Sequence, residues 1–307
     1  MTGFLPLDEV LDRSRAAFLG MAIGDALGAT VEFLTPGEIQ ARHGRHEELS
    51  GGGWLRLKPG QVTDDTEMAL CIARAIDRQG EWSLPAIADN FAAWLKAKPV
   101  DIGDTCRRGI RRYLLTGQLE APFNEYDAGN GAAMRMLPVA LFTLGDDGLL
   151  CRQVVAQARI THHHPLSDAA CICLGRLVHL AVAGASRLRL RREVDRLLAD
   201  HPTFRFDPYR GLATGYVVDT FQTVFHHFFR TRDFFDCLVG TVNQGGDADT
   251  TGAIAGMLAG AYYGTAGIPR KWLKRLDRKL VTEISELAER LVRLSPLGTD
   301  GGGDAMS

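Results

Sequence analysis

The stretch QGGDADTTGAIAGMLAGAYYG (residues 244–264) decides the fold of this chain. From residue 252 to residue 268 no side chain is charged, and glycine recurs at positions 252, 256, 260 and 264. In a membrane such a ridge would favour the pairing of two spanning helices. The segment is short for a span, however, and it is rich in small residues rather than Leu and Ile. We therefore expect a central helix of a helical bundle, whose glycines let neighbouring backbones approach closely.

Helical patterns fill the rest of the chain, and no run of alternating apolar and polar residues demands a strand. We expect one all-α domain over residues 1–297, with a compact multi-helix core, followed by a disordered tail at 298–307. Pro138 should kink or interrupt its helix, because it removes a backbone donor. The expected helical segments, besides the glycine ridge, are 7–28, 64–80, 83–97, 103–117, 131–145, 149–160, 168–184, 190–201, 215–230, 233–246 and 278–294.

The composition excludes several classes of protein. The chain is 46% hydrophobic and 23% charged with a formal net charge of -2, whereas a nucleic-acid-binding protein would usually show a basic excess. Its six cysteines form no CxxC pair, and the N-terminal segment MTGFLPLDEVLDRS lacks a basic region. We expect a cytoplasmic protein with free cysteines, no nucleic-acid partner and no integral membrane segment.

Two clusters of acids and threonines each precede an apolar helix, in VTDDTEMAL (62–70) and in GGDADTTG (245–252). Either cluster alone is typical of a helix start, where Asp and Thr cap free backbone N–H groups and acids favour the dipole. Asp64 and Glu67 also have the spacing of a capping box. One cap needs one oxygen, however, and the two clusters together offer four carboxylates with hydroxyls between them. Such an all-oxygen set suits Mg²⁺ or Mn²⁺ rather than Zn²⁺.

Five segments carry a resemblance to a known family. They are AFLGMAIGDALGATVEF (17–33), TDDTEMAL (63–70), the DIG of VDIGDTCRRG (100–109), GNGAAMRMLP (129–138) and NQGGDADTTGAIAGMLAGAYYG (243–264). Together they resemble the ADP-ribosylglycohydrolase family, from about residue 17 to the last helix. The RRGIRRY segment and HHHPLSD (162–168) are most similar to the bacterial members that act on dinitrogenase reductase, the nitrogenase iron protein.

The resemblance implies a dinuclear metal site at helix termini and a set of catalytic residues. It implies two divalent cations, Mn²⁺ or Mg²⁺, between the two acidic clusters. Asp101, the Asp of the DIG element, would be the acid or base of the reaction, and Glu32 would be a second carboxylate near the metals. The implied metal ligands are Thr63, Asp64, Asp65, Asp247, Asp249 and Thr250.

The resemblance also implies which residues contact the ADP-ribose. Asn130, Gly131 and Met134 would line it, and a helix starting at Gly131 would present N–H groups to the diphosphate. His162 and Tyr216 would be further contacts. His162 opens a histidine triplet, for which a ligand contact or a helix C-cap is expected rather than zinc binding. Asp104 stands where close relatives are expected to have Asn.

The expected activity is hydrolysis of ADP-ribosyl-arginine on a target protein, with ADP-ribosylated dinitrogenase reductase as the implied substrate. Two alternatives remain open: hydrolysis of another ADP-ribosyl linkage, and a non-catalytic binding role on the same scaffold. The resemblance further implies control by a PII-type signalling protein and, through it, reversible association with a membrane ammonium channel.

Overall fold

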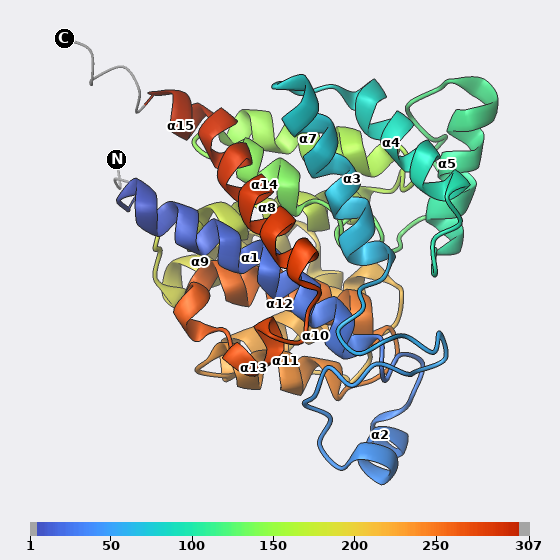
Figure 1. Cartoon of the computed structure of the whole chain (residues 1–307), viewed down its shortest axis with the longest axis vertical. Helices are drawn as coiled ribbons and strands as arrows, with labels where there is room; N and C mark the ends of the chain where they lie inside the picture. Colours follow the sequence, from blue (N-terminus) through green and yellow to red (C-terminus); the bar gives the residue numbers. More distant parts are fainter. Residues whose placement is uncertain (1–4, 301–307) are drawn as a thin grey trace.

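Helices are the regular elements of residues 5–300, the part of the chain that this computed structural model describes (Figure 1). Within that part the β-type pairs are two isolated bridges, so the all-α prediction is confirmed. The α-helices are α1 (Leu7–Gly28), α2 (Pro36–His43), α3 (Asp64–Gln79), α4 (Leu84–Lys96), α5 (Asp104–Thr116), α6 (Leu137–Phe142), α7 (Asp147–Arg159), α8 (Pro165–Val182), α9 (Arg187–Asp200), α10 (Val217–Arg230), α11 (Phe234–Val242), α12 (Ala248–Tyr263), α13 (Arg270–Leu273), α14 (Arg278–Leu294) and α15 (Pro296–Asp300). Two 3₁₀ turns, η1 (Pro202–Phe204) and η2 (Thr265–Gly267), complete them.

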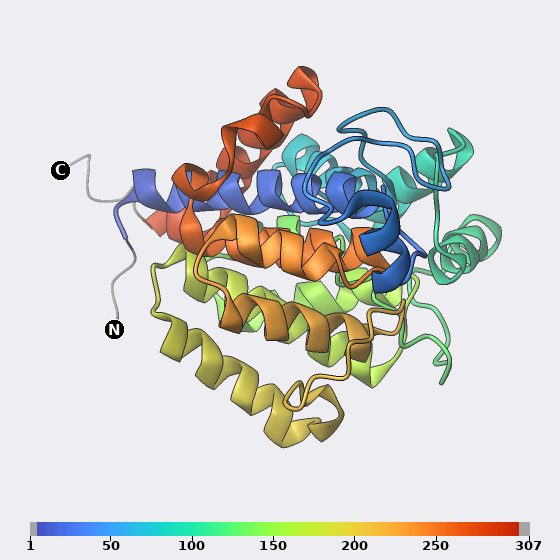
Figure 2. The ribbon, with the colours of Figure 1, turned by 90° about the horizontal axis from the view of Figure 1, so that it is seen from below.

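Helices α1 and α12 lie side by side at the centre and run antiparallel (Figure 2). A Cβ added at Gly20 would lie 2.3 Å from the carbonyl oxygen of Gly256, and one added at Gly24 would lie 2.0 Å from that of Gly252. The two backbones are therefore in direct contact along the glycine ridge, as the sequence predicted. This pairing fixes the register of the two helices, because any side chain on the shared face would separate them.

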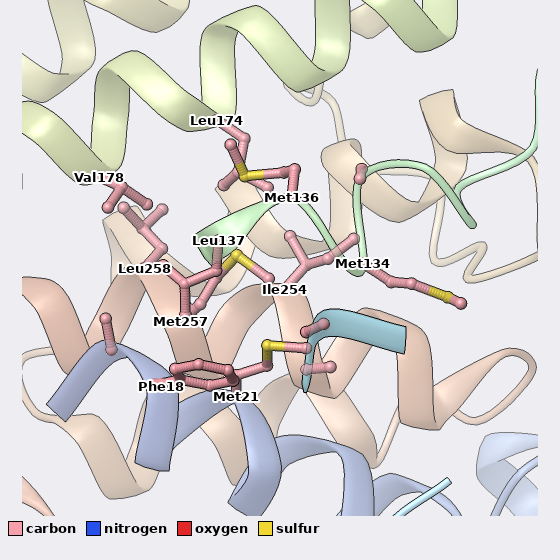
Figure 3. Close-up of a cluster of buried hydrophobic side chains, with 14 of the residues drawn as sticks. Phe18, Met21, Met134, Met136, Leu137, Leu174, Val178, Ile254, Met257 and Leu258 are labelled. Carbon is pink, nitrogen blue, oxygen red and sulfur yellow. The ribbon is translucent and has the colours of Figure 1, made fainter. Parts of the chain in front are cut away.

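The other helices pack around this pair. Helices α8, α10 and α11 cover α12, while α3 and α14 cover α1. Figure 3 shows the core at the junction, where side chains of α1, α8 and α12 meet the segment that leads into α6. The buried residues labelled there include Phe18, Met21, Met136, Leu137, Leu174, Val178, Ile254, Met257 and Leu258.

Helix α8, rather than the glycine ridge, is long and apolar enough to cross a membrane. Its window Pro165–Val182 has a mean hydropathy of 1.4, and 61% of that window is buried inside the protein. A core helix of a globular protein has the same properties, so this observation is weak support for a membrane span.

Most boundaries follow the sequence, and the differences have local causes. Residues 131–135 form turns instead of the expected helix, and α6 starts only at Leu137, so Pro138 lies in a first turn where its missing N–H is not needed. Helix α2 was not expected, although Thr35 and Glu38 form a complete capping box at its start. Helix α15 places residues 298–300 in a helix, and residues 301–307 lie outside the described part, so the disordered tail stays a prediction. The six cysteines are free.

Gly256→Ala is expected to destabilise the protein by about 3 kcal/mol or more, the upper range for overpacking. The new Cβ would lie 2.0 Å from the carbonyl oxygen of Gly20, a backbone atom that cannot move without separating α1 from α12. The matched control is Gly37→Ala on α2, whose Cβ would meet nothing within 4 Å and which should be neutral or slightly stabilising. Thermal melts of both variants test this, and an unchanged melting temperature for Gly256→Ala would contradict the close packing.

Candidate active site

The antiparallel pairing of α1 and α12 brings the end of one helix to the start of the other. Glu32 follows α1, while Asp247 and Asp249 stand at the start of α12. A carboxylate oxygen from each of these three residues lies within 4.8 Å of the others. Residues far apart in the chain thus form one acidic cluster.

Two glycines make the turn that carries Asp247 into the cluster. Gly245 and Gly246 have φ values of 66° and 62°, which favour glycine. Gly246 exchanges backbone hydrogen bonds with the segment after α1: Phe33 N–H donates to its oxygen (2.7 Å), and its own N–H donates to Leu34 O (2.9 Å). The turn therefore ties the end of α1 to the start of α12.

Asp25 of α1 holds the start of α3 in place. It is fully buried and accepts the N–H and hydroxyl of both Thr63 and Thr66, at 2.6 to 3.1 Å. Burial raises the pKa of Asp25 to about 6, and these four donors limit the rise. Asp25 lies in the segment AFLGMAIGDALGATVEF, whose pattern does not reveal this contact.

The side chains at the N-cap positions of α3 and α12 do not cap their helices. The N-cap residues Thr63 of α3 and Asp247 of α12 make no side-chain cap hydrogen bond. The capping box expected from Asp64 and Glu67 is wrong: Glu67 instead accepts the indole N–H of Trp94 at 2.7 Å. The capping alternative thus fails for both clusters.

Most of the carboxyl groups at the cluster are buried. Glu32, Asp64, Asp65 and Asp249 are between 1% and 6% exposed. Burial and then neighbouring carboxylates raise the pKa of Asp64 to about 8, and those of Asp65 and Asp249 well above their usual range. Burial also raises the pKa of Glu32 to about 8. Among residues 5–300, no salt bridge from Lys, Arg or His reaches these four acids.

The donor set of these residues fits hard divalent cations. Asp65 Oδ1 is buried and has no hydrogen-bond partner among the described residues. Its other oxygen accepts from the Thr250 hydroxyl at 3.3 Å and lies 3.4 Å from the Thr63 hydroxyl. A buried carboxylate oxygen without a donor is costly unless a cation faces it. Carboxylates and hydroxyls are the ligands that Mg²⁺ and Mn²⁺ prefer.

A cleft of about 740 Å³ opens onto the cluster, a size that suits a nucleotide-like ligand. Of the thirteen residues predicted for the site, ten line this cleft: Glu32, Asp64, Asp101, Asn130, Gly131, Met134, His162, Asp247, Asp249 and Thr250. Thr63 and Asp65 do not line the cleft and are at most 1% exposed. The side chain of Tyr216 does not line the cleft in this structure. Tyr216 is 40% exposed, and Gly215 lines the wall beside it.

Asp101 lies in the cleft just before α5. Its Oδ1 accepts the N–H of Ile102 at 2.7 Å, which leaves Oδ2 for other partners. Burial, and to a smaller extent the charge of Asp247, raises the pKa of Asp101. Asp104 also lines the cleft, but its side chain is 86% exposed and pairs with Arg107 at 2.9 Å.

The glycine turn at residues 129–131 packs against the cluster through Asn130. Its side-chain amide donates to Asp247 Oδ2 at 2.7 Å and to Thr220 Oγ1 at 2.9 Å. The expected helix N-terminus for a diphosphate is wrong, because no α-helix starts here and the N–H groups of Ala133 and Met134 already donate to Asn130 O.

The three histidines of the triplet make different contacts. His162 lines the cleft and is 2% exposed, while Nδ1 of His163 bonds to Ala121 O at 2.6 Å. His164 accepts the N–H of Leu166 and caps the start of α8, so the triplet supplies an N-cap and not the expected C-cap.

Two aromatic residues at the cleft were missed by sequence reasoning. Trp54 donates its indole N–H to Glu32 Oε2 at 2.5 Å, and its ring centroid lies 5.4 Å from that of Phe33. Phe33 and Trp54 both line the cleft although they are 64% and 52% exposed. Trp54 belongs to a segment between α2 and α3 that has no regular periodicity, so nothing in the sequence pattern pointed to it.

The metal-free protein is expected to lose stability as the pH rises. Folding raises the pKa of Asp64 from 3.8 and that of Glu32 from 4.5 to about 8, so the folded state holds protons that the unfolded state releases. The stabilisation present below about pH 4 is therefore lost progressively up to about pH 8. Melting temperatures of chelated protein measure this, with Asp64→Asn expected to flatten the dependence. A melting temperature that is constant or rises over this range would contradict the arrangement.

Comparison with known proteins gives a consistent result. A family model described as ADP-ribosylglycohydrolase matches residues 6–300. The chain is 57% identical over 289 residues to an ADP-ribosyl-[dinitrogen reductase] glycohydrolase of Rhodospirillum rubrum, covering 94% of this chain and 98% of that protein. It is 32% identical to an ADP-ribosylarginine hydrolase, Tri1, of Serratia proteamaculans, over 95% of this chain and 82% of that one. A solved structure titled ADP-ribosylglycohydrolase-related protein complex superimposes with a TM-score of 0.83 at 37% identity, covering 94% and 99% of the two chains.

Proposed function

Because the chain belongs to the ADP-ribosylglycohydrolase family, we propose that it hydrolyses the N-glycosidic bond between ADP-ribose and an arginine of a protein. The similarity to the Rhodospirillum rubrum enzyme, which extends over 98% of that protein, favours dinitrogenase reductase as the target. The single observation that carries the catalytic proposal is the buried acid cluster at the cleft, where no salt bridge within residues 5–300 reaches Glu32, Asp64, Asp65 or Asp249.

The cluster is proposed to bind two divalent cations, Mn²⁺ or Mg²⁺. Asp65 Oδ1 and the cleft-facing carboxylates are the main donors, and the hydroxyl of Thr63, which donates to Asp25, offers only lone pairs. Bound cations would orient the ribose hydroxyls and polarise a water molecule. The proposed ligands are Thr63, Asp64, Asp65, Asp247, Asp249 and Thr250.

The protein's own groups would handle the proton and the substrate. Asp101, which lines the cleft, keeps Oδ2 free of protein donors among the described residues and has a raised pKa, would exchange a proton during departure of the arginine nitrogen. With cations bound, which would favour its ionised form, Glu32, held by Trp54, would add negative charge beside the positive charge that develops on the sugar. Asn130, Gly131, Met134 and His162 would line the ADP-ribose, and Tyr216 would need to turn inward to contact it.

The direct test is release of ADP-ribose from modified dinitrogenase reductase and from ADP-ribosyl-arginine, compared with ADP-ribosyl-serine. We expect release from the arginine linkage with Mn²⁺ and none after chelation. Release from the serine linkage alone would favour the alternative of another ADP-ribosyl bond. A protein that binds ADP-ribose and releases it from neither would favour the non-catalytic alternative.

The resemblance also leads us to propose a cytoplasmic location and control through a PII-type signalling protein, with an ammonium channel as the membrane anchor. The exposed arginines Arg192 and Arg196 of α9 offer charges for such a contact. Binding of purified PII protein, with and without nucleotide and at two salt concentrations, tests this. No binding under any of these conditions would contradict the regulatory proposal and leave the hydrolase proposal standing.

A further inference from the structure

Arg135 is a fully buried cation in the turn that leads away from the cleft. Its Nε donates to Gln157 Oε1 at 2.9 Å and its Nη2 to Gln157 O at 3.0 Å, while the guanidinium lies 4.7 Å from the ring centroid of Phe91. Within residues 5–300 no salt bridge includes it. A guanidinium keeps its proton in proteins, so burying it without an acid is costly. An apolar side chain would fill the same space without that cost, which suggests a role beyond packing.

A chain of hydrogen bonds connects Arg135 to His162. Arg135 Nη2 donates to Thr161 Oγ1 at 2.8 Å, and Thr161 Oγ1 lies 2.7 Å from His162 Nδ1. Arginine can only donate, so the hydroxyl hydrogen of Thr161 is left for another acceptor. The acceptors beside it are His162 Nδ1 and the sulfur of Cys106, and sulfur is much the weaker of the two. Thr161 therefore donates to Nδ1, and the neutral ring carries its hydrogen on Nε2.

The other edge of the His162 ring faces the glycine turn of the cleft. A Cβ added at Gly129 would lie 3.1 Å from Nε2, and one added at Gly131 would lie 2.9 Å from Cε1. Burial, followed by the charges of Arg135 and Arg108, lowers the pKa of His162 well below its usual range, so the ring stays neutral. In the described part of the chain, Nε2 has no hydrogen-bond partner, and the residue lines the cleft.

We propose that Arg135 and Thr161 are positioning residues that hold His162 in the Nε2–H tautomer, so that this N–H donates to an oxygen of the bound ADP-ribosyl group. The family resemblance implies a contact from His162 and no role for the other two residues. The identity of the ligand rests on the proposed function, whereas the tautomer rests on the hydrogen bonds alone.

The tautomer is measured first, by ¹⁵N NMR of the histidine side chains in protein without ADP-ribose. The His162 signal is assigned by its loss in His162→Gln. We expect the Nε2–H tautomer in the wild type and in Thr161→Ser, which keeps the hydroxyl, and a shift towards Nδ1–H in Thr161→Val. An Nδ1–H tautomer in the wild type, or no difference between the two variants, would overturn the proposal.

The consequence for binding is measured next, as the affinity for ADP-ribose. Thr161→Val should weaken it about tenfold, close to the loss of one hydrogen bond, while Thr161→Ser stays within about twofold. The matched control is Thr241→Val on α11, which removes a buried hydroxyl bonded to Cys237 O, outside the cleft, and should leave the affinity unchanged.

A double-mutant cycle decides whether Thr161 acts through His162. In a His162→Gln background, Thr161→Val should weaken ADP-ribose binding no further. Equal losses in both backgrounds would overturn the positioning role. If the wild type binds no ADP-ribose, the proposed function and the ligand half of this proposal both fail, while the NMR result still decides the tautomer separately.

Discussion

Asp249→Ala is expected to abolish hydrolysis and metal binding together. Asp249 is 3% exposed, shares the cluster with Glu32 and Asp247, and has no salt-bridge partner in the described chain. Removing a residue that only hydrogen-bonds to a metal ligand typically lowers metal affinity about 10–100-fold. Removing a residue that binds the metal directly should therefore lower it on the order of 10²-fold or more. Metal content after dialysis and ADP-ribose release measure the two effects.

The same variant carries an internal check on folding. Without metal, Asp249→Ala should melt at or above the temperature of the metal-free wild type, because one buried repelling carboxylate is gone. The control Asp195→Ala removes an exposed acid of α9 that pairs with Arg191, and it should keep both metal and activity. Full activity of the Asp249→Ala protein after chelation would refute the metal site.

Asp101→Asn is expected to lower kcat by roughly 10²-fold or more while the metals stay bound, the scale of general acid–base catalysis. Asparagine keeps an oxygen for the N–H of Ile102, so the loop before α5 should hold its shape. The amide cannot exchange a proton as the carboxyl does. ADP-ribose affinity should therefore change little, which separates turnover from binding.

The neighbouring acid provides a matched control for this variant. Asp104→Asn changes a carboxylate of the same cleft that is exposed and paired with Arg107, and it should alter kcat less than tenfold. If Asp101→Asn instead loses its metals, Asp101 is a ligand first, and its proposed role in proton transfer is wrong.

The sequence predicted the helices well where the apolar spacing extended over a long segment. Helices α1 and α14 have the expected bounds, and the glycine ridge pairs as expected. The prediction from the sequence failed for short elements. Helix α2 has little apolar periodicity and depends on the capping box of Thr35 and Glu38. The turn at residues 131–135 contains glycine and alanine but is not helical, because Asn130 before it is hydrogen-bonded to Asp247 and Thr220.

The acidic clusters could be recognised from composition, since carboxylates and hydroxyls crowd two helix starts. Their partners could not, because those contacts exist only after α1, α3 and α12 have packed. Asp25 appears in the sequence as one acid inside an apolar helix, and only the fold shows that four donors from α3 surround it. Trp54 and Arg135 are likewise defined by what they touch, the first by Glu32 and the second by Thr161.

The pairing of α1 with α12 also sets the order of events while the protein is being made. A ribosome that has translated the first 240 residues has produced α3 and its acids but none of the acids of α12. Until α12 leaves the exit tunnel, the glycine face of α1 has no partner backbone, and the nascent chain holds only half of the proposed ligands. If the proposed ligands bind metal, loading would follow synthesis of α12, and fragments that stop before α12 should acquire neither metal nor activity.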